Sequence, residues 1–228
     1  MAYPSVLGEM ETLALVAGGA SIARYGDGEF ALAEGRSIRP QRHAAGLAER
    51  LRSILLGDCG SCLVGIPNIQ SRTPKAKFWE KYTRCAALLS AECDYVSSFI
   101  TRPDNAPWID QPAYWQQIES LWRDRDVTLV RGDNPNGTGA VSLVASDLLS
   151  AHSVTEVIAP GVNAWADYEH ILRRIGTPRI ALLCLGATAT VLAVDLCRRG
   201  VHAIDLGHAG MFLHQRAGIP VRKYAVAS

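Results

Sequence analysis

The sequence predicts a doubly wound α/β fold: a mainly parallel sheet with helices on both faces, in a single domain over residues 1–228. Three observations lead to it. Short apolar runs alternate with amphipathic segments along the whole chain, as in doubly wound sheets. The chain has 228 residues, 48% of them hydrophobic, which is enough for one large core. No repeat, low-complexity tract or linker divides it.

Seven runs are predicted strands. Each is short and bounded by Gly, Pro, Asp or Asn, and most are nearly continuous in apolar residues, the pattern of strands buried on both faces. They are Ser21–Arg24, Cys62–Ile66, Tyr95–Ile100, Val127–Val130, Val154–Ala159, Ile180–Leu185 and His202–Leu206.

The segments between these runs have helical periodicity. In the first of them Leu47, Leu51 and Leu55 recur on one face while charged side chains occupy the other. The predicted helices are Ala44–Leu56, Lys75–Leu89, Gln111–Trp122, Ala140–Leu149, Trp165–Ile175 and Ala187–Arg199, and a further helix is expected to start near Glu29.

Bulk composition excludes several classes of protein. With 23 Lys+Arg against 22 Asp+Glu, the net charge of +1 argues against broad binding to nucleic acid. No apolar run reaches the roughly 20 residues of a transmembrane helix. The amino-terminal segment carries Glu9 and Glu11 where a secretory signal would be basic, so we expect a cytoplasmic protein. Cys59 and Cys62 form the one CxxC pair, and all six cysteines are expected to be reduced thiols.

Ligands of parallel sheets bind beyond the carboxyl ends of the strands, so the polar residues just after each strand are the candidates for a site. These positions supply two or more acidic groups, several hydrogen-bond donors and a histidine. The residues are Asp27, Glu29, Asn68, Thr101, Arg102, Arg131, Asp133, Asn163, Thr188, Asp205 and His208.

The sharpest local pattern runs from Arg24 to Phe30, Arg-Tyr-Gly-Asp-Gly-Glu-Phe. Asp27 and Glu29, separated by one glycine, can converge on a hard cation such as Mg²⁺ or Mn²⁺ if the backbone turns tightly. The same pattern fits an acidic turn in which Asp27 caps the following helix. From the residues alone, both interpretations stay open.

Two further strand ends carry possible binding groups. Gly186 leads a buried strand directly into a helix, where the backbone N–H groups and the Thr188 hydroxyl can meet a phosphate, or Thr188 can simply cap the helix. Asp205 and His208 end the last strand; the histidine is a metal or acid–base candidate if the Asp27 loop is near.

Three other residues have both a binding and a structural interpretation. Asn163 can bond a base or ribose, or cap a helix. Arg102 can clamp a diphosphate through two hydrogen bonds, or form a loop ion pair. Trp108, in the Pro-rich stretch Arg102–Pro112, is the candidate for stacking on an acceptor sugar.

Taken in order, these segments resemble the GT-D type bacterial glycosyltransferases, a family long catalogued as a domain of unknown function. The resemblance covers roughly Ser21 to His214. It rests on Arg24–Glu29, Gln41, Val64–Pro67, Thr101–Pro103, Pro160, Asn163 and Tyr168, Leu185–Thr190, and Asp205–His208.

The resemblance implies a Rossmann-like fold and the transfer of glucose or a similar hexose from a nucleoside diphosphate donor, with Mn²⁺ or Mg²⁺ as cofactor. It also implies that Asp27 and Glu29 form the metal motif. Such enzymes build surface polysaccharides or glycosylate surface proteins, so the expected partners are a UDP-hexose and a saccharide or glycoprotein acceptor. A homo-oligomer is compatible with the sequence.

One segment departs from the family pattern. After Arg131-Gly132-Asp133 the chain reads Asn134-Pro135-Asn136-Gly137-Thr138-Gly139-Ala140-Val141, which keeps the glycines but lacks the family's arginine and its Asn-Asp. If that arginine contacts the donor diphosphate, Arg131 or Arg102 must substitute for it.

The resulting hypothesis gives each residue a role. Asp27 and Glu29, with His208, hold the metal; Arg24 or Arg102 and the helix start at Thr188 stabilise the diphosphate leaving group. Asp205, or Asp133 as second choice, accepts the acceptor's proton. Two alternatives stay open: a non-catalytic module that binds a nucleotide or sugar phosphate, and a metal-dependent hydrolase.

Overall fold

A computed structural model of the chain describes residues 3–69, 82–105, 109–133, 146–207 and 209–219. Their centre is an eight-stranded sheet in the order β1-β4-β3-β2-β8-β7-β5-β6, in which every neighbouring pair is parallel. The strands are β1 (Val6–Leu7), β2 (Ile22–Arg24), β3 (Leu63–Ile66), β4 (Tyr95–Ser97), β5 (Asp126–Gly132), β6 (Ser153–Ala159), β7 (Ile180–Cys184) and β8 (His202–Asp205).

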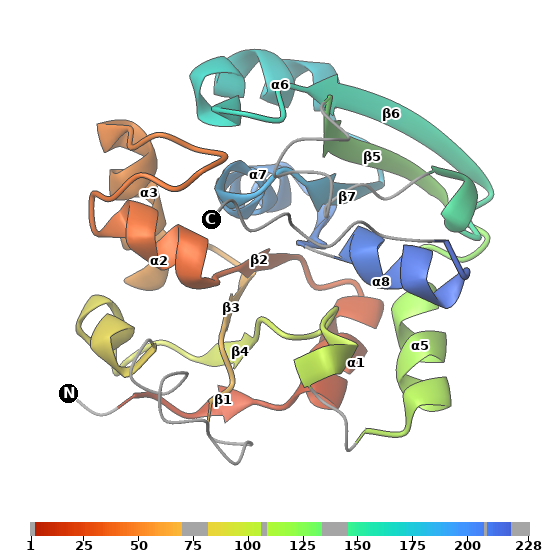
Figure 1. Ribbon diagram of the computed structural model, residues 1–228, viewed down its shortest axis with the longest axis horizontal. Coiled ribbons are helices and arrows are strands. Elements are labelled where there is room, and N and C mark those ends of the chain that lie inside the picture. Colours follow the sequence, from red (N-terminus) through yellow and green to blue (C-terminus); the bar gives the residue numbers. More distant parts are fainter. Residues whose placement is uncertain (1–2, 70–81, 106–108, 134–145, 208, 220–228) are drawn as a thin grey trace.

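Seven α-helices in the described residues cover the sheet: α1 (Glu9–Ala17), α2 (Asp27–Ala33), α3 (Ala45–Leu55), α5 (Gln111–Glu119), α6 (Tyr168–Ile175), α7 (Ala187–Cys197) and α8 (Ala209–Arg216). Short 3₁₀ turns are η1 (Arg84–Leu88), η2 (Pro103–Asn105), η4 (Ser146–Leu148) and η5 (Ala164–Asp167). In Figure 1 the strands run from β6 at the top to β1 at the bottom, with helices on either side.

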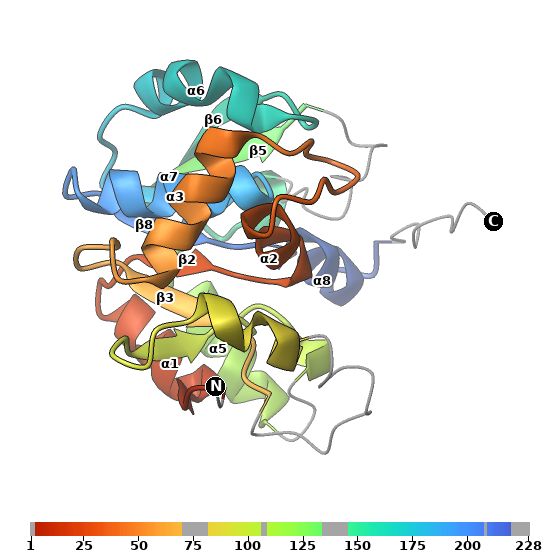
Figure 2. The same cartoon turned by 90° about the vertical axis from the view of Figure 1, so that its left-hand side faces the viewer.

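Two apolar clusters fill the two faces of the sheet, so the fold is doubly wound. Helices α2, α3, α6 and α7 pack on one face, and α1, α5 and α8 on the other. Figure 2 shows α3 crossing in front of the sheet with α6 above it. Successive residues of β7 alternate between the two clusters, with Leu182 on one side and Leu183 on the other. This is why the strand reads as a continuous apolar run.

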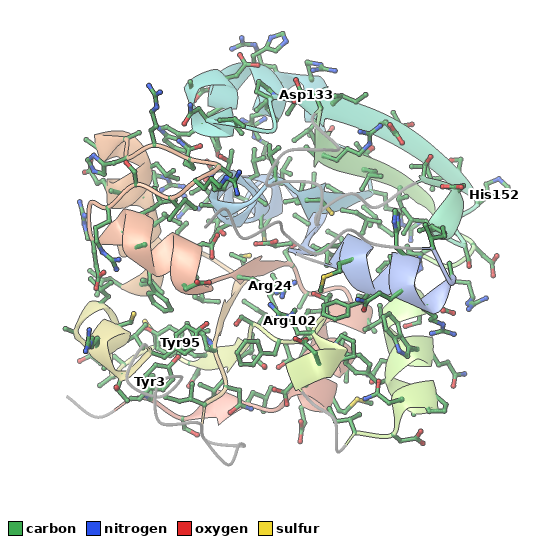
Figure 3. The ribbon with its side chains drawn as sticks, viewed as in Figure 1. Tyr3, Arg24, Tyr95, Arg102, Asp133 and His152 are labelled. Carbon is green, nitrogen blue, oxygen red and sulfur yellow. The ribbon has the colours of Figure 1, made fainter. Side chains whose placement is uncertain are left out.

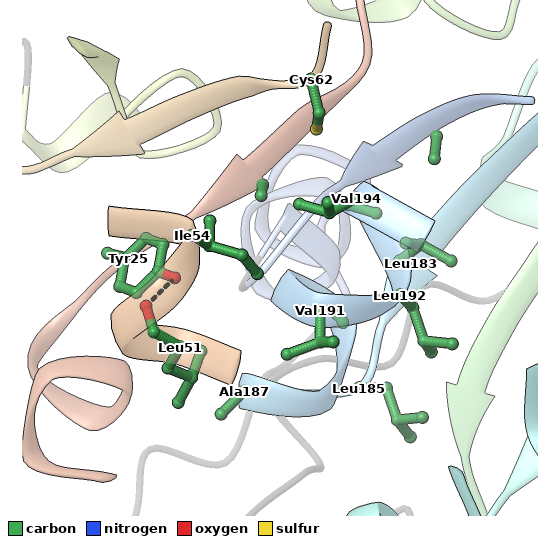
Figure 4. Close-up of a cluster of buried hydrophobic side chains, with 14 of the residues drawn as sticks. Tyr25, Leu51, Ile54, Cys62, Leu183, Leu185, Ala187, Val191, Leu192 and Val194 are labelled. Atoms are coloured by element: carbon green, nitrogen blue, oxygen red, sulfur yellow. Dashed lines mark hydrogen bonds between the residues drawn. The ribbon is translucent and has the colours of Figure 1, made fainter. Parts of the chain in front are cut away.

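The helix α7 is the most deeply buried, because it lies between the sheet and α3 (Figure 4). Val191, Leu192 and Val194 are fully buried there. Beside them the Tyr25 hydroxyl donates to the carbonyl oxygen of Leu51 at 2.8 Å, which ties the residue after β2 to α3. The amino end of α7 and the loop after β2 are therefore fixed relative to each other.

The predicted fold class is confirmed, and each of the seven predicted runs contains a strand. The predictions of their ends were less accurate. The run Tyr95–Ile100 is a strand only to Ser97, since the chain then turns and its Ser98 carbonyl oxygen accepts from Arg24 Nε. The strand β1, which has two residues, and the helices α1 and α8 were not predicted.

The helical predictions also need correction in places. Trp165–Ile175 begins with the 3₁₀ turn η5, and α5 ends at Glu119 rather than Trp122. Residues 75–81 of Lys75–Leu89 and residues 140–145 of Ala140–Leu149 lie outside the described residues, and the described remainders contain η1 and η4. Among the described helices none combines the length and apolar character needed to cross a bilayer. The cytoplasmic location stays a prediction.

The sheet order reverses between β2 and β8. The chain leaves β2 for α2 and α3 on one face and returns as β3, whereas it leaves β8 for α8 on the opposite face. The loops after these adjacent strands therefore diverge, and a crevice opens between them at their carboxyl ends.

Candidate active site

A cleft of about 400 Å³ occupies this crevice. It receives residues from the ends of β2, β4, β5, β6, β7 and β8. The lining residues are Arg24–Glu29, Ile38–Gln41, Tyr82, Ser98, Phe99, Arg102, Gly132, Gly161, Ala164, Cys184–Ala187, Asp205 and Gly207. Six of these are glycines, so much of the wall is bare backbone that a ligand can approach closely.

Arg24 is the buried cation at the base of the cleft. Its Nε donates to the Ser98 carbonyl oxygen at 2.8 Å, and its Nη1 donates to Thr101 Oγ1 at 2.7 Å and to the Asp205 carbonyl oxygen at 3.1 Å. Burial lowers the pKa of Arg24, and the nearby Asp205 opposes that shift. The side chain thus joins β2 to the loop after β4 and to the end of β8.

Asp205 is also buried, at the end of β8. Its Oδ2 accepts from the Arg24 backbone N–H at 3.2 Å, and its Oδ1 accepts from the Gly207 N–H at 3.0 Å. The Thr190 hydroxyl lies 3.4 Å from Oδ2 and donates to the Arg24 carbonyl oxygen at 3.0 Å. Burial raises the pKa of Asp205 to about 6, against the opposing effect of Arg24.

Glu29 and Asp27 stand at the start of α2. Glu29 Oε2 accepts from the Gly26 N–H at 2.8 Å, so Glu29 caps the helix, and not Asp27 as the structural interpretation of the sequence had it. Burial first, and then the charges of Asp205 and Asp27, raise the pKa of Glu29 to about 7. Asp27 is exposed and lines the cleft. Three carboxylates therefore influence one another here.

Arg102 lies on the cleft wall but is already paired. Its Nε and Nη2 each donate to one oxygen of Asp104 at 2.9 Å, and its guanidinium lies 5.7 Å from the ring centre of Phe212. The pairing with Asp104 raises its pKa. Figure 3 shows Arg102 and Arg24 near each other below the end of β2. The predicted loop ion pair is present, and it occupies the Nε–Nη2 edge of the Arg102 guanidinium.

The wall at the ends of β5 and β6 differs from the prediction. Arg131 pairs with Glu156 at 2.7 Å, and Asp133 Oδ1 accepts from the Gly161 N–H at 2.8 Å. Neither side chain lines the cleft, and Asp133 lies well away from Arg24 in Figure 3. In this geometry Arg131 is not placed to bind a donor, nor Asp133 to act as a base.

Asn163 has a structural partner in place of a ligand. Its Oδ1 accepts from the Arg42 N–H at 2.7 Å, its own N–H donates to the Pro40 carbonyl oxygen at 2.8 Å, and its backbone is left-handed, with φ of 55°. Asparagine tolerates that conformation better than most residues. The predicted contact with a base or ribose is therefore replaced by a link to the 38–42 turn.

At the start of α7 the backbone reaches the cleft, and its contact with a phosphate stays a prediction. Gly186 and Ala187 line the cleft, and Gly186 has a φ of 54°, which explains the glycine. Thr188 does not cap the helix: it is buried, its hydroxyl has no hydrogen-bond partner among the described residues, and it is not part of the cleft wall. His208, Trp108 and the Gly137–Val141 stretch lie outside the described residues.

The carboxylates of the cleft have the right chemistry for a hard divalent metal. They do not by themselves provide a complete set of metal ligands. Carboxylate oxygens are the ligands that Mg²⁺ and Mn²⁺ prefer. Within the described ranges, however, no three His, Cys, Asp or Glu side chains converge well enough to hold an ion. This set fits a metal bound by one or two carboxylates together with substrate phosphates.

Two features of the site were not foreseen. Arg39 lines the cleft from the tip of a turn between α2 and α3, although it follows no strand. The Ser98 carbonyl oxygen orients Arg24, but a backbone acceptor leaves no mark in the sequence. A second, more open depression of about 850 Å³ lies between α3, α6 and α7. Its Asp195 is held by Arg50 and Tyr168, so we place the active site in the smaller cleft.

The parallel sheet, with an acidic and glycine-lined cleft at its reversal point, defines the class: α/β proteins that bind their ligand beyond the strand ends. Comparisons with known proteins then identify the family. Residues 22–212 match the family described as the glycosyltransferase GT-D fold. The chain belongs to this family of glycosyltransferases.

Two relatives of this chain are named as glycosyltransferases. The probable glycosyl transferase Gly of Streptococcus gordonii is 32% identical over 209 residues, covering 83% of this chain and 30% of that protein. Glycosyltransferase GlyD of Streptococcus pneumoniae serotype 4 is 29% identical over 204 residues, covering 82% of this chain and 24% of that protein. The chain thus spans less than a third of the length of these relatives.

Solved structures similar to this chain are also described as glycosyltransferases. One, described as the domain of unknown function 1792 with a distinct glycosyltransferase fold, has a TM-score of 0.79 at 31% identity, covering 96% of this chain and 84% of the other. Another, described as a new glycosyltransferase from Streptococcus sanguinis, has a TM-score of 0.75 at 30% identity, covering 96% of this chain and 87% of the other.

Proposed function

We propose that this domain transfers a glucose-like hexose from a UDP-sugar to a saccharide or glycoprotein acceptor, with Mn²⁺ or Mg²⁺, in the synthesis of bacterial surface glycans. The observation that carries the proposal is that Asp27, Glu29 and Asp205 all line one cleft of a GT-D fold. Carboxylates repel a diphosphate, so a donor of this kind needs a cation between the carboxylates and its phosphates.

Asp27 and Glu29 are the residues that would hold the metal. Asp27 is exposed at the cleft, and Glu29 lines it from the first turn of α2, which its Oε2 caps. The metal would supply electrostatic stabilisation of the diphosphate as it leaves the sugar. The raised pKa of Glu29, caused first by burial and then by neighbouring carboxylates, is the behaviour of a site that gains from a bound cation.

Asp205 is the proposed general base. It lines the cleft, and the Arg24 and Gly207 N–H groups hold both of its oxygens in place. Its pKa of about 6 keeps it mainly ionised at neutral pH and makes it a better proton acceptor than an ordinary aspartate. Arg24 supports this role by fixing the end of β8, and it does not need to touch the sugar.

Thermal unfolding tests the proposal directly. The protein is heated with UDP-, GDP-, ADP- and CDP-sugars, each with Mn²⁺ and with EDTA. A metal-dependent rise in the midpoint with one UDP-hexose is expected, because a ligand that binds only the native state stabilises it. The Asp27→Ala and Glu29→Ala variants should lose that rise.

The outcomes separate the alternatives. A rise that EDTA does not change would favour a binding module without the metal, and full transfer activity in both variants would exclude Asp27 and Glu29 as ligands. Steady release of free sugar without an acceptor would favour a hydrolase. No shift with any donor would contradict the proposed donor class.

A further inference from the structure

Three arginines line the cleft, and they differ in what else they bind. Arg24 is buried and spends Nε and Nη1 on Ser98, Thr101 and Asp205. Arg102 is paired with Asp104 through two hydrogen bonds. The side chain of Arg39 is exposed and makes no hydrogen bond or ion pair with any described residue. Among the described residues, Arg39 is therefore the cleft arginine with no part of its guanidinium engaged by another side chain or carbonyl group.

The backbone that carries Arg39 is held rigidly. Ile38 and Gln41 exchange two backbone hydrogen bonds, of 2.9 and 3.2 Å, so Arg39 and Pro40 form the tip of a tight turn. Asn163 holds this tip through the Pro40 carbonyl oxygen at 2.8 Å and the Arg42 N–H at 2.7 Å. The Gln41 Oε1 also accepts from the Trp165 N–H at 3.3 Å.

These contacts connect the turn to the loop after β6, and residues of both segments line the cleft. An arginine on a fixed backbone loses less conformational freedom when it binds than one on a free loop. Its planar guanidinium also suits the paired oxygens of a phosphate.

We propose that Arg39 is the residue that binds the diphosphate of the donor, and that Asn163 is a positioning residue that holds the Arg39 turn over the cleft. This inference rests on the proposed donor class. It assigns the diphosphate contact to a residue that follows no strand, in place of Arg131 and Arg102, whose side chains are committed to Glu156 and Asp104.

Isothermal titration with UDP, GDP, ADP and CDP in the presence of Mn²⁺ tests the assignment. Arg39→Ala should weaken binding of the preferred diphosphate about 10- to 100-fold, the range for losing a hydrogen bond to a charged group. Arg39→Lys should bind the diphosphate more tightly than Arg39→Ala and more weakly than the wild type. Arg36→Ala is the matched control, because Arg36 is in the same connection but pairs with Glu34 outside the cleft, and it should bind as the wild type does.

Asn163 is tested by rescue. Asn163→Ala should weaken diphosphate binding about threefold to tenfold and speed hydrogen exchange at the Arg42 amide, since that amide loses its acceptor. Asn163→Asp keeps the acceptor oxygen and should restore both properties.

The outcomes separate this inference from the proposed function. If the wild type binds a diphosphate and Arg39→Ala binds it equally well, the role of Arg39 is refuted while the proposed function stands. If the wild type binds none of the four, the proposed donor class fails, and the inference with it. If Asn163→Asp remains as weak as Asn163→Ala, Asn163 does not act through the Arg42 contact.

Discussion

The two walls of the cleft are built in opposite ways. On the β2–β8 wall, Asp27, Glu29 and Asp205 present carboxylates to the cleft. On the β5–β6 wall, Arg131, Asp133 and Asn163 bind neighbouring protein groups and leave glycine facing the cleft. Polar residues follow the strands on both walls, so a polar residue at a strand end is not by itself a sign of a binding group. What decides is whether the adjacent loop already offers it a partner.

The proposed function needs its chemistry on the β2–β8 wall, and Asp205→Asn is the strongest test. The amide keeps the size of the side chain and one acceptor oxygen, but its NH2 group faces one of the two backbone N–H donors and the side chain cannot accept a proton. We expect the rate of transfer at saturating donor to fall about 10²- to 10⁴-fold, the usual contribution of a general base. Initial rates would check this, and a cooperative thermal transition above the assay temperature would show that the variant is folded. A variant within a few-fold of wild-type activity would move the base elsewhere.

Arg24→Met tests whether the same wall depends on its buried cation. The change leaves Asp205 buried without the neighbouring positive charge, so we expect unfolding in urea at pH 7 to cost about 3–5 kcal/mol less. The double variant Arg24→Met/Asp205→Asn should be less destabilised than the sum of the two single variants, because no buried charge is left unpaired. Additive losses would show that the two residues act independently.

The pH dependence of stability follows from the same pair. The pKa of Asp205 is raised from 3.8 to about 6, so the folded protein binds its proton more tightly than the unfolded chain does. The stabilisation from protonated Asp205 is full below about pH 4 and is lost as the pH rises through about 6. The loss should be about 1–3 kcal/mol, and Asp205→Asn should remove it. Urea unfolding from pH 4 to 8 in EDTA would check this, and equal slopes for both proteins would contradict it.

The sequence predicts the β2–β8 wall better than the β5–β6 wall, for a physical reason. Arg24–Glu29 is a continuous segment in which one tight turn brings the groups together, so local pattern is enough. Arg131 and Asp133 owe their positions to Glu156 and Gly161, which follow some 25 residues later, and no local pattern shows such pairing. Arg39 was missed because it is brought to the cleft by a turn and by Asn163, not by a strand.

Gly132→Ala tests the glycine backbone of the β5–β6 wall. A methyl group at this position would lie 2.8 Å from the Cα of Gly161, too close for either backbone to stay in place. We expect a loss of about 1–3 kcal/mol in stability, typical of overpacking, and a higher KM for the donor as the wall shifts. Gly176→Ala is not a suitable control because Gly176 has a positive φ of 65°. Ala166→Gly, in the exposed turn η5, is a milder comparison.

Asp133→Ala should have the smallest effect, and it distinguishes the two walls most clearly. The variant removes one exposed hydrogen bond, from the Gly161 N–H to Asp133 Oδ1, so we expect a loss of about 1 kcal/mol or less in the free energy of unfolding. Because Asp133 does not line the cleft, kcat should stay within about twofold of wild type. Parallel measurements on Asp205→Asn give the contrast. A loss of kcat in Asp133→Ala comparable to that in Asp205→Asn would mean that the β5–β6 wall reaches the reacting atoms after all, and that the wall's ion pairs and loop contacts rearrange when the donor binds.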